Sequence, residues 1–153
     1  MSIYSRIKSE PPVEEVQKNQ TPFYMSNTNE GFECLVFNGE EIYDEGGHTF
    51  TFYENGVLLT LKNNCRFHKD CEHHNGSKSF IFYNNNGEKV LDVYNSTREK
   101  EPEKDIDVTI YNGFILVKET SFKNNSETEY FVSVKTGKIV PDFGAEEEQT
   151  LAP

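Results

Sequence analysis

Short apolar runs separated by turn-forming pairs dominate the chain between residues 22 and 143. The runs are rich in aromatic and β-branched side chains, and Asn-Gly, Gly-Gly or Thr-Gly pairs separate them. This pattern is typical of β-hairpins, because glycine readily adopts the positive φ that tight hairpin turns require. It predicts strands at 32–37, 40–44, 48–54, 57–62, 78–83, 88–94, 106–111, 114–121, 128–134 and 138–141.

The fold class follows from this alternation of strands and turns. No segment keeps the period of 3.6 residues that an amphipathic helix shows, so we expect little helix. We predict an all-β, antiparallel, hairpin-rich single domain, either a small barrel or sandwich or a propeller-like series of repeated sheets. A β-trefoil is the alternative, because three units of about 50 residues fit a chain of 153.

Three of the turns share a pattern that indicates an internal repeat. In each, glycine is followed by a charged residue, by Ile or Val at the third position and by Asp at the fifth, as in Gly-Glu-Glu-Ile-Tyr-Asp at 39–44. These glycines, at 39, 87 and 137, lie 48 and 50 residues apart. A second pattern around Asn55-Gly56 returns around Asn112-Gly113, so the repeat is two hairpins long. The third copy is expected to stop early, because only 16 residues follow Gly137.

One stretch of this repeat resembles a known family. Residues 130–142, Tyr-Phe-Val-Ser-Val-Lys-Thr-Gly-Lys-Ile-Val-Pro-Asp, resemble a unit of the bacterial WG-type β repeats, and residues 111–118 resemble its closing strand. The resemblance covers about half of the chain, and the characteristic tryptophan is absent. Because such repeats are associated with protein binding, the resemblance implies a binding module.

The two ends of the chain are polar. Residues 1–21 contain two adjacent prolines and many charges, so we predict a flexible N-terminal arm before a β domain at 22–143. Residues 144–153 are expected to form a flexible acidic tail. No apolar run is long enough to span a membrane, and the first residues have no apolar signal core. With only three cysteines, these features predict a cytoplasmic protein.

Charge narrows the range of partners. The chain holds 26 acidic and 15 basic residues, and its net charge of −11 disfavours binding of a nucleic-acid backbone by the main surface. A basic protein is the expected partner. The acidic side chains that we select as candidate partner contacts crowd one turn and a charged insertion at 99–107: Glu40, Glu41, Asp44, Glu45, Glu99, Glu101, Glu103 and Asp105.

A cluster of cysteine and histidine is the main candidate for chemistry. Two of the three cysteines and three of the four histidines lie within residues 65–74, where they could bind Zn²⁺. The candidate ligands are Cys65, His68, Cys71, His73 and His74. A Cys65–Cys71 disulfide and a polar loop without a ligand remain open as alternatives. A metal bound by four protein ligands would be structural, because catalytic zinc keeps an open position.

No motif of a known enzyme class is present. The sequence has no phosphate-binding glycine loop, no nucleophile elbow and no His-Glu-x-x-His helix. We therefore predict a non-catalytic, acidic protein-binding or inhibitory module that contacts its partner through charged loops and exposed aromatic residues. A zinc-binding module centred on residues 65–74 is the alternative function.

Overall fold

The computed structural model describes residues 2–27, 33–43, 48–62, 78–94, 104–122 and 124–142. The strands are β1 (Phe23–Asn27), β2 (Glu33–Phe37), β3 (Glu40–Tyr43), β4 (Thr49–Tyr53), β5 (Gly56–Lys62), β6 (Lys78–Asn84), β7 (Lys89–Tyr94), β8 (Lys104–Ile110), β9 (Phe114–Ser121), β10 (Ser126–Ser133) and β11 (Ile139–Val140), and the helices are α1 (Ile3–Lys8) and the 3-10 turn η1 (Lys18–Gln20). Neighbouring strands pair antiparallel, which confirms the predicted all-β hairpin fold. Within the described ranges, no helix has the length and apolar character to cross a membrane.

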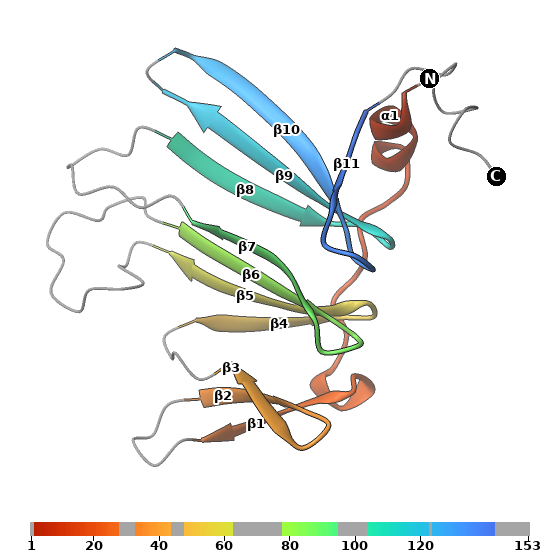
Figure 1. Ribbon diagram of the computed structural model, residues 1–153, viewed down its shortest axis with the longest axis vertical. Coiled ribbons are helices and arrows are strands. Elements are labelled where there is room, and N and C mark those ends of the chain that lie inside the picture. The colour runs from red at the N-terminus through yellow and green to blue at the C-terminus, as the bar shows by residue number, and fades with distance from the viewer. Residues whose placement is uncertain are drawn as a thin grey trace, which may run out of the picture.

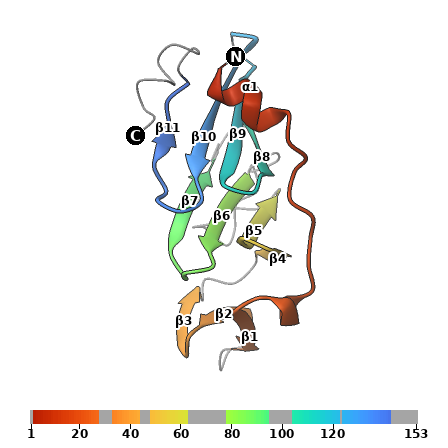
Figure 2. The same ribbon diagram turned by 90° about the vertical axis from the view of Figure 1, so that its right-hand side faces the viewer.

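In the described ranges, the strands form three sheets stacked in a row (Figures 1 and 2). We call them the first sheet (β1-β2-β3), the middle sheet (β4-β5-β6-β7) and the last sheet (β8-β9-β10-β11). This arrangement corresponds to the repeated-sheet alternative of the prediction. Strand β1 was not predicted from sequence, because it directly follows the polar N-terminal segment and no turn signal precedes it.

Two hydrophobic cores hold the row together, and the middle sheet contributes to both. Val57 and Ile81 of the middle sheet pack towards the first sheet. Leu58 and Phe82, their neighbours in sequence, pack towards the last sheet. Because successive side chains of a strand point to opposite faces, a sheet covered on both faces needs an uninterrupted apolar run. This explains the sequences Val-Leu-Leu at 57–59 and Phe-Ile-Phe-Tyr at 80–83.

The three turn glycines occupy the same place in their sheets. Gly39, Gly87 and Gly137 lie in the last hairpin of the first, middle and last sheet, with φ of 83°, 76° and 75°. In the part of the chain that the structure describes, the structural unit therefore ends at this hairpin, whereas the copies inferred from sequence begin with it; counted in this way, the last sheet has four strands and the first sheet has three.

Two asparagine side chains join the turns of the middle and last sheets. The Asn84 side-chain amide, which is buried, donates a hydrogen bond to the Val134 carbonyl oxygen at 2.8 Å. The Asn55 amide donates to the carbonyl oxygens of Tyr111 and Asn112, at 2.8 and 2.9 Å. These bonds fix the turn edge of one sheet against that of the next, since a buried carbonyl without a partner is costly.

Residues 2–22 connect the two ends of the row. After α1, an extended segment follows one side of the stack and reaches the first sheet through η1 (Figure 2). The Val13 N–H donates to the Ile110 carbonyl oxygen of the last sheet at 2.8 Å, and the Val16 N–H donates to that of Phe52 in the middle sheet at 2.9 Å. The segment that the sequence assigns to a flexible arm thus has regular contacts, because Val13 packs against the core between the middle and last sheets and Ile7 packs in a further cluster on the last sheet.

Candidate functional site

We call the face of the last sheet that points away from the middle sheet the outer face. It carries an apolar row, made of Tyr111, Leu116 and Phe131, and a charged row, made of Asp107, Lys118, Glu127 and Glu129. Along β9, Ile115 and Val117 point into the core shared with the middle sheet. Leu116 and Lys118, which alternate with them, point to the opposite face. Strand register places Leu116 beside Phe131 and Lys118 beside Glu129.

Helix α1 covers the apolar row of the outer face. Ile7 is 7% exposed and packs with Tyr111, Leu116 and Phe131. The Tyr4 ring meets the Phe131 ring edge to face, with centroids 4.9 Å apart. Burial of these apolar groups is the main force that seats the helix, since six residues are too few to form a stable helix alone.

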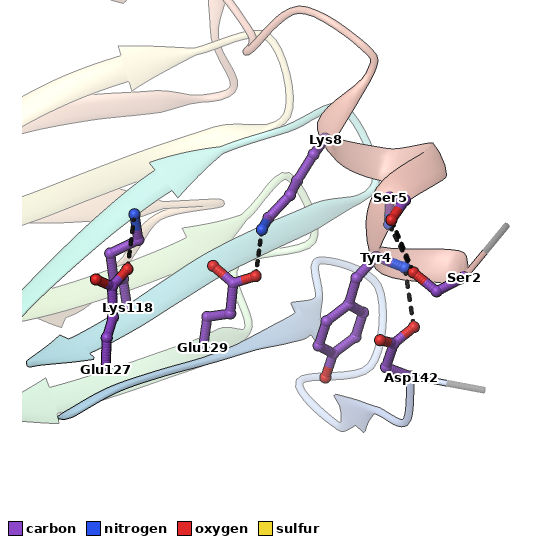
Figure 3. Close-up of polar contacts among 8 residues, drawn as sticks. All are labelled: Ser2, Tyr4, Ser5, Lys8, Lys118, Glu127, Glu129 and Asp142. Carbon is purple, nitrogen blue, oxygen red and sulfur yellow. Dashed lines mark hydrogen bonds and ion pairs between the residues drawn. The ribbon is translucent and has the colours of Figure 1, made fainter. Parts of the chain in front are cut away.

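Polar contacts set the position of α1 on this surface (Figure 3). The helix begins after Ser2, whose hydroxyl accepts a hydrogen bond from the Ser5 N–H at 3.1 Å. The Tyr4 N–H donates to Asp142 Oδ1 at 3.2 Å, and the Tyr4 hydroxyl donates to the Val140 carbonyl oxygen at 2.8 Å. Lys8, in the last turn, forms an ion pair with Glu129 of β10.

The charged row has one cation among several carboxylates. Lys118 Nζ lies 3.1 Å from Glu127 Oε1, and register places Asp107 and Glu129 directly beside Lys118 on the neighbouring strands. The hydrogen bond and charge of Glu127, followed by the charges of Glu129 and Asp107, raise the pKa of Lys118 above its ordinary 10.5. The row is therefore acidic overall, and its lysine stays protonated at neutral pH.

We expect Glu127→Gln to bring the pKa of Lys118 back towards 10.5, because Glu127 is its largest perturbing group. The pKa is measured by NMR titration of the Lys118 ε-carbon. A raised folded pKa means that the charged lysine stabilises the fold below the unfolded pKa, and that this contribution disappears as pH rises through the folded pKa. Glu119→Gln is the control, because Glu119 perturbs Tyr130 and not Lys118. An unchanged Lys118 pKa in Glu127→Gln would contradict this assignment.

Two hollows lie on either side of the turn between β8 and β9. The larger, about 400 Å³, separates α1 from this turn and is lined by Ile3, Arg6, Ile7, Glu10, Tyr111, Asn112, Gly113 and Phe114. The smaller, about 260 Å³, lies between the turns of the middle and last sheets and is lined mainly by asparagines: Asn55, Asn84, Asn85, Asn86 and Asn112, with Gly113, Val134 and Lys135. The hollow beside α1 shows that the helix leaves part of the outer face unfilled.

The sequence-predicted metal ligands, Cys65, His68, Cys71, His73 and His74, lie outside the described residues. In the ranges that the structure describes, no three His, Cys, Asp or Glu side chains gather in a way that could hold a metal ion. The third cysteine, Cys34, is a free thiol buried in β2.

The predicted partner contacts divide between described and undescribed parts of the chain. Asp44, Glu45, Glu99, Glu101 and Glu103 lie outside the described residues. Glu40 and Glu41 are exposed in β3 of the first sheet, whereas Asp105 lies in β8 of the last sheet, 2.9 Å from Lys78 Nζ. The middle sheet separates these two groups (Figure 1).

Sequence reasoning missed the charged row of the outer face. Asp107 falls both in the charged insertion at 99–107 and in the strand predicted at 106–111; in the structure it belongs to β8, where it lies opposite Lys118 of β9. Glu127 and Glu129 alternate with Thr128 and Tyr130 just before Phe131, and this period of two is a signal for one solvated strand face. The signal alone does not show which charges lie together, because that depends on register between strands.

Comparison with known proteins finds no matching family model, no matching curated protein and no matching solved structure.

Proposed function

We propose that this chain is a cytoplasmic, non-catalytic protein-binding module that binds a basic partner through the outer face. The observation that carries the proposal is the seating of a basic helix on this surface. Helix α1 holds Arg6 and Lys8, and Lys8 reaches a carboxylate of the charged row. The outer face thus already accommodates apolar and positively charged groups of a polypeptide, the combination that a basic partner would offer.

Two further features support the proposal. The charged row presents more carboxylates than cations, so it attracts positive charge even with Lys118 in place. Stacked repeat units also provide extended surfaces for binding, and the resemblance to WG-type repeats agrees with this. The other predicted contacts, Glu40 and Glu41, lie in the first sheet at the opposite end of the row and are not part of this surface.

We expect the variant Asp107→Asn, Glu127→Gln, Glu129→Gln to lose its partner, since it removes three negative charges from the outer face. The measurement is affinity purification from the native host with wild type and variant, followed by titration of the captured protein at increasing salt. Binding should weaken as salt rises, because exposed charges are screened. The control variant Glu40→Gln, Glu41→Gln should retain capture. Equal capture by the triple variant and wild type, or an affinity independent of salt, would refute the proposal.

A zinc-binding module remains the second candidate function. Register pairs Lys62 of β5 with Lys78 of β6, so the chain returns to the sheet beside the point where it left. A chain segment whose two ends are held close together loses less conformational entropy when several of its side chains bind one metal ion. Elemental analysis of protein purified without chelator should find about one zinc per chain, and none in Cys65→Ser, Cys71→Ser. A zinc content that is the same in both proteins would exclude this site.

A further inference from the structure

Helix α1 lies where a fourth sheet would continue the row. In the first hairpin of the middle sheet, Leu58 lies two residues after Gly56, which closes the turn, and it packs towards the last sheet. In the last sheet, Leu116 lies two residues after Phe114, which closes the corresponding turn, and it packs with Ile7 of α1. The outer face is therefore built as a stacking face, and α1 occupies it.

The second hairpins show the same correspondence. In the middle sheet, the N–H of Asn84 closes the turn by donating to the Glu88 carbonyl oxygen. Phe82 lies two residues before Asn84 and is fully buried against the last sheet. Phe131 precedes Ser133 in the same way and is fully buried under α1. Phe82 and Phe131 thus occupy matching positions, but Phe82 packs against a sheet and Phe131 packs against a single short helix.

A short helix covers this stacking face less completely than a sheet does. Among the six residues of α1, Ile7 is the buried one. The hollow of about 400 Å³ remains between the helix and the β8–β9 turn, beside Ile7 and Phe114. The hollow is open to solvent, and its lining mixes these apolar groups with the charged residues Arg6 and Glu10. Apolar groups that border unfilled space contribute less packing to stability. A helix with a larger apolar residue at the position of Ile7 would fill this space and bind the outer face more tightly than α1 does.

The contacts of α1 define the chemistry of a competing ligand. The Val140 carbonyl oxygen accepts a hydrogen bond from the hydroxyl of an aromatic residue. One helical turn later, an aliphatic or aromatic side chain packs on the apolar row. The next residue is basic and forms an ion pair with Glu129. The pattern is aromatic-x-x-apolar-basic on one face of a helix, as in Tyr4 to Lys8.

We propose that the outer face of the last sheet is a docking site for a short basic amphipathic helix of a partner protein, and that α1 occupies this site in cis until the partner displaces it. The inference rests on the proposed function and specifies its site and ligand. Because α1 competes within the same chain, the apparent affinity for an external helix equals the intrinsic affinity multiplied by the fraction of molecules in which α1 has left the site.

The test uses the full chain and a fluorescent peptide with the sequence of residues 2–9, in its natural form and with Ile7→Phe. The chain variant Ile7→Asp places a carboxylate among Tyr111, Leu116 and Phe131 and so releases α1. We expect this variant to bind the peptides about tenfold more tightly than wild type does. We also expect the Ile7→Phe peptide to bind more tightly than the natural one. Addition of Glu129→Lys to the chain should abolish binding.

A second measurement applies to the wild-type chain and does not depend on the variants folding. An excess of the Ile7→Phe peptide should shift the NMR amide signals of Leu116, Glu129 and Phe131 and leave those of Leu35 and Tyr83 unchanged. No shift at the outer face, or binding that survives Glu129→Lys, would overturn the inference. Dimerisation of the Ile7→Asp chain without peptide binding would also overturn it and would identify a second copy as the occupant. If partner capture depends on Asp107, Glu127 and Glu129 but the peptides do not bind, a helix is not the ligand of the outer face. The proposed function would then still stand.

Discussion

Gly56→Ala is expected to destabilise the protein by more than about 4 kcal/mol, a large fraction of the stability of a typical domain. A Cβ at position 56 would lie 2.2 Å from the Tyr83 carbonyl oxygen and 2.6 Å from two carbons of the Phe82 ring. Pairing of β5 with β6 holds both backbones, with Gly56 opposite Asn84. Relief of the overlap therefore requires β5 and β6 to separate, and these two strands form the centre of the middle sheet.

Gly113→Ala is the matched control for this prediction. Both glycines follow an asparagine, but a Cβ at position 113 would have no atom within 4 Å, and Gly113 has no positive φ. We expect its effect on the free energy of unfolding to stay within about 0.5 kcal/mol. Urea unfolding of the two variants, followed by circular dichroism, measures both effects. Equal stability of the two variants would contradict the close approach at Gly56.

Asn84→Ala is expected to cost about 3 kcal/mol, because one buried side chain makes three hydrogen bonds. Its amide donates to the Val134 carbonyl oxygen at 2.8 Å, and its Oδ1 accepts from the N–H groups of Asn86 and Glu88 at 3.0 and 3.1 Å. The first bond joins the middle sheet to the last, and the other two shape the turn between β6 and β7. Truncation leaves the Val134 carbonyl without this partner.

Two companion variants separate these contributions. Asn84→Asp keeps both acceptor bonds and loses the donor to Val134, so its loss of stability should include the inter-sheet bond and the cost of a buried charge. Asn86→Ala, at an exposed position of the same turn, should change stability by less than about 0.5 kcal/mol. The midpoint of urea unfolding provides the measurement. A stability loss in Asn84→Ala no larger than that in Asn86→Ala would show that the inter-sheet bond contributes nothing.

The two Asn-Gly pairs show where local sequence stops being informative. From their Asn-Gly pairs, Gly56 and Gly113 are both expected to be positive-φ residues of primed turns. In the structure the turn residues are Glu54-Asn55 and Asn112-Gly113, so that Gly56 is the first residue of β5 and Gly113 belongs to its turn. The expectation of a positive φ is wrong for Gly113. The shift of one residue in the turn places Gly56 against Phe82 and Tyr83 of β6 and lets the Asn55 amide reach Tyr111 and Asn112 of the last sheet. These contacts are between residues distant in sequence, so the Asn-Gly pair does not encode them.

The chain by itself determined the hairpins, the repeat and the fold class. These features depend on contacts between residues close in sequence, such as the turn at Gly39 or the apolar run at 80–83, and they leave a direct pattern of period two and turn glycines. Tertiary structure decided the stacking order of the sheets, the place of α1 and the acidic outer face. Asp107, Lys118 and Glu129 come from three strands, and only strand register brings them together. The seat of α1 joins residues more than a hundred positions apart, and local patterns hold no information about such contacts.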